Sequence, residues 1–68
     1  MKLSYFKDTD TLYIELSEGS SIESQEMSPG IVFDYDGQDK VIGIEIEGAS
    51  KHTDLNFMEE DTLKISKN

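Results

Sequence analysis

Oxygen-bearing side chains are the residues of this sequence best suited to chemistry, and one loop holds a dense group of them. Asp34, Asp36 and Asp39 are close enough along the chain to offer carboxylate oxygens to one hard cation such as Ca²⁺. Part of the spacing of an EF-hand calcium loop is followed by Asp34, Asp36, Gln38 and Glu45, but Asp39 stands where that loop needs glycine. We therefore expect no EF-hand, and the same three aspartates also suit an ordinary acidic hairpin turn.

Catalysis by an activated nucleophile or a carboxylate pair finds little support. The chain has no cysteine, and its only histidine, His52, lies in a polar stretch. A carboxylate pair needs a water-excluding cleft, for which 68 residues without tryptophan have little material. No glycine-rich phosphate loop occurs, and zinc is disfavoured because it prefers Cys and His ligands. We therefore predict a protein that is not an enzyme, with no catalytic residue and no cofactor.

Charge is the strongest signal in the composition. Six lysines and fifteen acidic residues give a net charge of −9, and no basic residue occurs between Lys7 and Lys40. A surface of this sign repels phosphate backbones, so direct nucleic-acid binding is not expected. It attracts basic proteins and cations, and Asp34 and Asp36 are therefore candidate contacts for a protein partner.

Length sets further limits on the molecule. A chain of 68 residues forms one domain, 1–68, with a small core, and without disulfides self-association as a homodimer is an expected source of stability. No apolar run approaches the roughly 20 residues that cross a bilayer, and the N-terminus does not resemble a signal peptide. We therefore expect a soluble, cytoplasmic protein with no membrane contact.

The elements that must position these side chains are mostly strands. Apolar and polar residues alternate over 2–7, 11–17, 31–35 and 41–47, and more weakly over 21–27, where a bulge near Ser24 and Gln25 would restore the alternation. This pattern predicts a mainly β fold, with a four- to five-stranded antiparallel sheet of hairpins over 2–51. The predicted core face holds Leu3, Tyr5, Leu12, Ile14, Leu16, Ile31, Phe33, Ile42, Ile44 and Ile46.

Two hairpins set the predicted register. A turn at 8–11 pairs Lys7 with Leu12 and places Phe6 opposite Tyr13, two aromatic residues on the second face that become candidate interaction residues. A two-residue turn would place Asp34 opposite Asp39, which is a destabilising pair of like charges, so a four-residue loop at 36–39 is favoured. That loop pairs Tyr35 with Lys40, Phe33 with Ile42 and Ile31 with Ile44.

The C-terminal part, 52–68, changes its periodicity. Apolar residues three apart and flanking glutamates favour a short helix over 53–63, whereas Leu63 and Ile65 are also compatible with a further strand, followed by a frayed tail. The second face of the sheet carries Phe6 and Tyr13 and needs a cover. That cover is either this segment, through Leu55, Phe57, Met58 and Leu63, or a second copy of the chain.

Two strand motifs resemble a known family. Leu12-Tyr13-Ile14-x-Leu16, and Gly43-Ile44-Glu45-Ile46 followed by Ala49-Ser50, are similar over about residues 2–51 to a family of short prokaryotic domains of unknown function, numbered 2283. The resemblance implies a small, mostly β fold and no established activity. That family usually has Asp after the first Tyr, where this chain has Phe6. Some members look like the acidic half of toxin–antitoxin-type pairs, which implies an antitoxin-like role.

Overall fold

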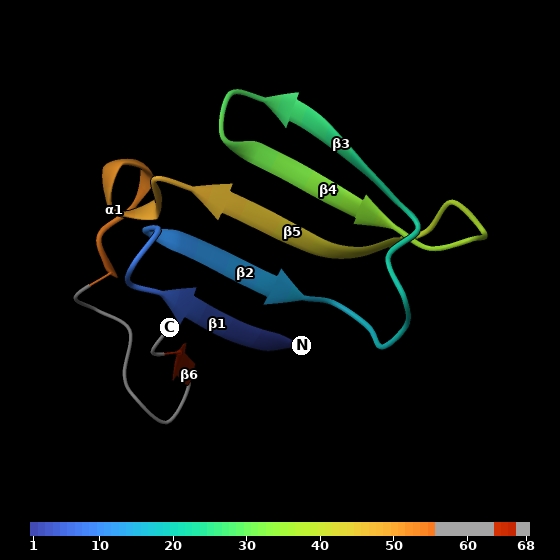
Figure 1. Ribbon diagram of the computed structural model, residues 1–68, viewed down its shortest axis with the longest axis horizontal. Coiled ribbons are helices and arrows are strands. Elements are labelled where there is room, and N and C mark those ends of the chain that lie inside the picture. The colour runs from blue at the N-terminus through green and yellow to red at the C-terminus, as the bar shows by residue number, and fades with distance from the viewer. Residues whose placement is uncertain (56–63, 67–68) are drawn as a thin grey trace.

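Six strands form one sheet in the computed structural model, which describes residues 1–55 and 64–66 (Figure 1). The first five are β1 (Lys2–Phe6), β2 (Thr11–Glu15), β3 (Glu23–Ser28), β4 (Ile31–Tyr35) and β5 (Val41–Glu47). The helix α1 (Ala49–His52) and the strand β6 (Lys64–Ser66) follow. The predicted mainly β fold, with antiparallel strands and a short helix after them, is confirmed.

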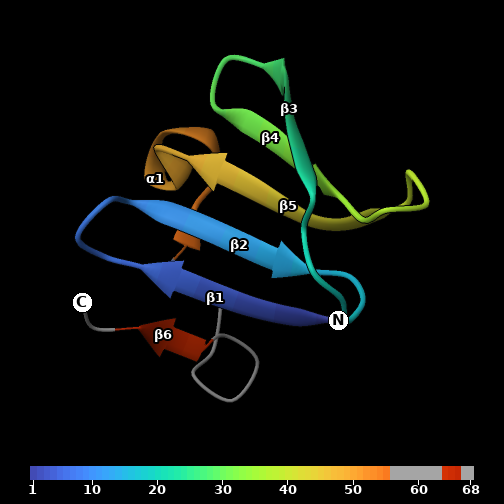
Figure 2. The same ribbon diagram turned by 45° about the vertical axis from the view of Figure 1, so that its right-hand side comes forward.

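The strand order is β3-β4-β5-β2-β1-β6. Pairings among the first five strands are antiparallel, whereas β6 lies parallel to β1 at the edge opposite to β3 (Figure 2). The strand alternative for Ile65 is thereby confirmed. The helix predicted over 53–63 falls mostly outside the described residues, and the short helix observed lies earlier, at Ala49–His52. No helix in the described part of the chain is long and apolar enough to span a membrane.

One face of the sheet gathers the aliphatic side chains, as their alternation predicts. Two rows of facing side chains cross β1, β2, β5 and β4 in that order. They are Leu3–Ile14–Ile44–Phe33 and Tyr5–Leu12–Ile46–Ile31. We call this surface the isoleucine face. Leu12 and Ala49 are its buried centre, and Leu55 packs against them from the chain beyond α1. Leu55 therefore covers the isoleucine face and not the second face; Phe57, Met58 and Leu63 lie outside the described residues. Leu16, predicted in the core, is 40% exposed.

The first hairpin is paired two residues away from the predicted register. Phe6 faces Thr11, Tyr5 faces Leu12 and Leu3 faces Ile14, so Tyr13 lies opposite Ser4. The reason is the turn, in which Asp10 adopts a left-handed backbone (φ 53°) and donates its N–H to the Lys7 carbonyl at 3.3 Å. A shift of two residues keeps every side chain on its predicted face, because side chains alternate with period two.

The second hairpin, β4–β5, also differs from its predicted pairing, because its β5 strand contains a bulge. Asp36 and Lys40 close a three-residue loop in which Asp39 is left-handed (φ 63°). Such a loop alone would turn the isoleucines outward. The register shift after Asp34, however, leaves Ile42 as an extra residue, so Tyr35 faces Val41 while Phe33 faces Ile44 and Ile31 faces Ile46.

The β3–β4 hairpin turns through Pro29 and Gly30, with Gly30 at φ 85°. Proline followed by a left-handed glycine is the signature of a type II turn, whose twist matches a hairpin poorly. The register shift lies next to this turn, between Glu26 and Ser28, and not near Ser24 and Gln25 as predicted. Every residue of β3 is exposed, and its outer edge faces no other described strand.

Asp10 ties the first hairpin to the helix. Its carboxylate accepts hydrogen bonds from the Tyr5 hydroxyl at 2.7 Å and from the Ser50 hydroxyl at 2.7 Å, and its carbonyl accepts the Ala49 N–H at 2.8 Å. Figure 1 shows the result, with α1 at the end of β5 beside the start of β2. This contact positions the chain end of β5, which carries two residues of the site described next.

Candidate functional site

The face opposite to the isoleucines is polar and aromatic, and the strand register sets its three rows. These rows are Phe6–Thr11–Glu47, Ser4–Tyr13–Glu45–Val32–Glu26 and Lys2–Glu15–Gly43–Asp34–Ser24. We call this surface the open face. Lys2 is the only basic residue in the three rows, and it lies 4.0 Å from Glu15 in an exposed ion pair. The open face is therefore mainly acidic.

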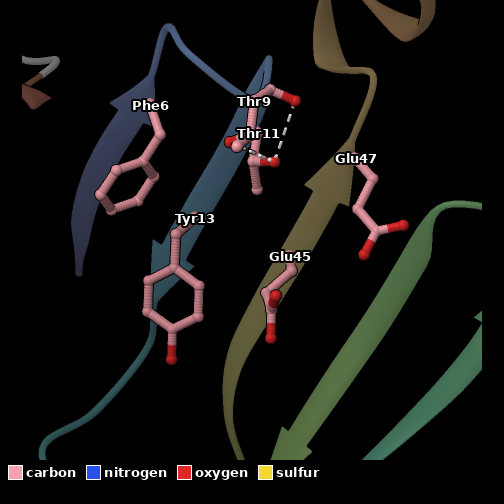
Figure 3. A pocket seen from close by; sticks show the side chains of 6 residues that line it. All are labelled: Phe6, Thr9, Thr11, Tyr13, Glu45 and Glu47. Atoms are coloured by element: carbon pink, nitrogen blue, oxygen red, sulfur yellow. Dashed lines mark hydrogen bonds between the residues drawn. The ribbon is translucent and has the colours of Figure 1, made fainter. Parts of the chain in front are cut away.

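A hollow of about 540 Å³ lies over β1, β2 and β5, and we call it the groove (Figure 3). Two aromatic rings, Phe6 and Tyr13, line it on the β1–β2 side, and two carboxylates, Glu45 and Glu47, line it on β5. The remaining lining residues are Thr9 and Thr11, whose hydroxyls are hydrogen-bonded at 3.0 Å. The lining thus combines apolar ring surface with negative charge.

The position of the Tyr13 ring depends on the absence of a side chain at Gly43. A Cβ at position 43 would lie 2.6 Å from the Tyr13 Cζ, well inside contact distance. Tyr13 and Gly43 are diagonal neighbours on adjacent strands, and an aromatic side chain covering a strand glycine is a known stabilising arrangement. Gly43 therefore provides the space in which the phenol ring rests.

Asp34 lies near the hydroxyl end of that ring. It is only 4% exposed, and the Ser24 hydroxyl donates a hydrogen bond to its Oδ1 at 2.5 Å. The Tyr13 side chain lies close enough to Asp34 for the charge of that carboxylate to act on the phenol. Burial of the ring, followed by the negative charge of Asp34, raises the pKa of Tyr13 above its usual range. Asp34 is therefore a buried carboxylate beside the groove wall.

Glu45 completes this network. Its pKa is raised, first by burial, then by a hydrogen bond with Asp34 and by repulsion from Asp34 and Glu47. An external cation beside Glu45 would therefore offset the repulsion among these carboxylates.

The structure brings together two of the four predicted interaction residues. Phe6 and Tyr13 both line the groove, although they are not the directly facing pair that the sequence predicted. Asp34 belongs to the same face but lies beneath it, and Asp36 is in the β4–β5 turn. Glu45 and Glu47 were missed as site residues, although their alternation with Ile44 and Ile46 placed them on the second face.

The three aspartates considered for a metal ion have separate roles. Asp34 is bonded to Ser24, and Asp36 Oδ1 accepts the backbone N–H groups of Lys40 at 3.0 Å and Gln38 at 2.8 Å. These bonds lower the pKa of Asp36. Asp39 supplies the left-handed residue of the turn. Among the residues that the structure describes, no three acidic, His or Cys side chains are grouped to hold a metal ion.

Comparison with known protein families finds a match over most of the chain. A family model described as a protein of unknown function (DUF2283) matches residues 2–50, which include all of β1 to β5. The matched region contains every lining residue of the groove and the Asp10–Ser50 contact. No curated protein and no solved structure matches the chain.

Proposed function

Because the chain belongs to the DUF2283 family, whose description assigns no activity, we propose a function from the chemistry of its open face. The chain is a non-enzymatic interaction module that binds a basic protein and neutralises it, as the acidic half of a toxin–antitoxin-type pair does. The groove is the observation that carries this proposal, because it offers both carboxylates and aromatic rings on a rigid sheet.

Charge distribution supports a basic partner. The net charge is −9, and the one basic side chain in the open-face rows is already beside Glu15. An excess of carboxylates over cations, as in these rows, speeds association with a positive surface and disfavours negative partners. Aromatic residues at the centre of such a patch supply the apolar contact area that exposed ion pairs lack.

The test is to identify the protein that co-purifies with the tagged chain from its native host, and then to measure the affinity of the purified pair by calorimetry. We expect a partner with an excess of lysine and arginine, one-to-one binding, and a Kd that rises about tenfold or more between 50 and 300 mM NaCl. A partner without excess positive charge, or an affinity insensitive to salt, would contradict the proposal.

The choice of variant for that test follows from burial. Reversing the charge of Asp34 would force a long cationic side chain into a buried site, so a loss of binding would not distinguish a lost contact from unfolding. Glu47 is exposed and lines the groove, so Glu47→Lys reports on the surface itself.

Self-association is the second candidate function, and β3 favours it. This edge strand is exposed along its whole length; it contains the apolar side chain of Met27 (50% exposed) and directly follows that of Ile22 (73% exposed). An unprotected edge of this kind can pair with a strand from a second copy. A homo-oligomeric structural domain would then be formed through the edge, leaving the open face unoccupied.

A further inference from the structure

The groove has two walls of different chemistry. On one side the rings of Phe6 and Tyr13 present flat apolar surface, and on the other Glu45 and Glu47 present carboxylates (Figure 3). All four side chains project from paired strands, so their spacing is set by the sheet. A ligand that fits both walls must be flat on one side and must donate hydrogen bonds as a cation on the other.

We propose that the groove recognises the guanidinium group of an arginine side chain presented by the basic partner. This inference rests on the proposed function and deepens it. A guanidinium is planar and weakly hydrated, stacks on aromatic rings, and donates N–H groups to carboxylates in a fixed fork. A lysine ammonium is a compact, strongly hydrated charge, which matches the carboxylates but not the rings.

The groove is organised before the ligand arrives. The Tyr13 ring rests over Gly43 and lies near Asp34, which accepts a hydrogen bond from Ser24. A fixed wall of this kind lowers the entropic cost of binding, because the side chain has no further freedom to lose. A cation beside Glu45 also offsets the repulsion that this carboxylate receives from Asp34 and Glu47.

The first experiment titrates the ¹⁵N-labelled chain with N-acetylarginine methylamide and, separately, with N-acetyllysine methylamide, followed by NMR. We expect the arginine compound to shift amide signals of the groove residues with a millimolar Kd. The lysine compound should have a Kd at least about fivefold higher. Equal affinities, or shifts spread over the whole acidic surface, would overturn the inference.

Variants separate the groove from general negative charge. Glu45→Gln with Glu47→Gln removes both groove carboxylates, and we expect the arginine Kd to rise about tenfold. Glu18→Gln with Asp39→Asn makes the same change of charge at exposed sites outside the groove and should change the Kd less than about twofold. An equal loss of arginine affinity in the two double variants would show that only net charge matters, and it would overturn the proposed arginine site in the groove.

A charge-neutral variant tests the aromatic wall. Gly43→Ala displaces the Tyr13 ring without altering any charge, and we expect it to weaken arginine binding while the spectrum remains that of a folded protein. If that variant does not fold, Phe6→Leu tests the same wall from the half-buried β1 position. Arginine affinity unchanged in the folded variant would contradict a role for the rings.

The two proposals fail in distinguishable ways. If the purified basic partner loses equal affinity for the groove variant and for the Glu18/Asp39 variant, the interaction module stands and the arginine site does not. If no basic partner binds with salt-dependent affinity, the proposed function is wrong, whatever the arginine titration shows. Selective loss of partner affinity in the groove variant alone supports both.

Discussion

Asp10 shows how much one residue can organise in so small a chain. Its side chain accepts hydrogen bonds from Ser50 and Tyr5, and its carbonyl accepts one from Ala49, so three segments meet at one turn. Bonds to an ionised carboxylate are stronger than neutral ones. The Asp10 carboxylate therefore links the β1–β2 turn to the chain that leaves β5.

Replacing Asp10 with Asn should therefore destabilise the fold in a pH-dependent way. At pH 7 we expect Asp10→Asn to lower the Tm by about 4 °C or more. The hydrogen bonds from Ser50 and Tyr5 lower the pKa of Asp10, so the stabilisation exists above the unfolded-state pKa and is lost as pH falls through the lower folded-state pKa.

Thermal unfolding of both proteins from pH 7 to pH 3 measures this effect. The difference in Tm should narrow at the acidic end, and Asp8→Asn, an exposed change in the same turn, should show little difference at any pH. A difference for Asp10→Asn that stays constant with pH would show that the carboxylate charge is not responsible.

The burial of individual side chains was the property of the site that the sequence predicted least well. Asp34 alternates with Phe33 and Tyr35 and so was placed on the polar face correctly, yet nothing in the sequence signals that it is covered. Its burial comes from Ser24 on β3 and Tyr13 on β2, two strands that approach it only in the folded sheet. Such long-range contacts are invisible to local periodicity.

Strands, in contrast, were largely predictable from the sequence. The period of two located β1, β2, β4 and β5 and assigned most of the isoleucine face, because burial of one face demands it. The registers were each wrong by two residues, because a shift of two leaves every side chain on the same face. Left-handed Asp10 and Asp39, with the extra residue at Ile42, decided the registers.

The β3–β4 turn offers a test at this scale. Gly30 has φ 85°, and a Cβ there would lie 3.2 Å from the Glu47 carbonyl oxygen. We expect Gly30→Ala to cost about 1–2 kcal/mol of unfolding free energy, measured by urea denaturation, because a left-handed backbone disfavours any Cβ. The β4–β5 loop provides the matched control.

That control is Gly37→Ala, since the atom nearest to a new Cβ there is the end of the exposed Ile22 side chain, at 3.4 Å. Its cost should be clearly smaller than that of Gly30→Ala. Equal costs in the two variants would mean that the turn conformation at Gly30 does not limit stability.

At the scale of the whole molecule, net charge separates the two candidate functions. Salt screens attraction between the acidic chain and a basic partner, so it weakens that complex. Between two copies, each with a charge of −9, salt screens repulsion and strengthens association. The sign of the salt effect therefore identifies the kind of partner.

We expect any dimer formed through β3 to become more abundant between 50 and 300 mM NaCl, as measured by sedimentation equilibrium. Met27→Lys places a charge on that edge and should abolish the dimer. Leu16→Lys adds the same charge at another exposed apolar position and should leave self-association intact. Equal effects of the two changes would remove β3 from the interface.

The contact between Tyr13 and Gly43 also restricts how this sequence can evolve. Any larger residue at position 43 occupies the volume of the phenol ring, and a smaller residue at position 13 uncovers the strand glycine and leaves a gap beside Asp34. A substitution at either position is therefore unfavourable as long as the residue at the other position is unchanged. In related chains the two positions should change as a pair, and a chain that has lost the pair should also have lost the aromatic wall of its groove.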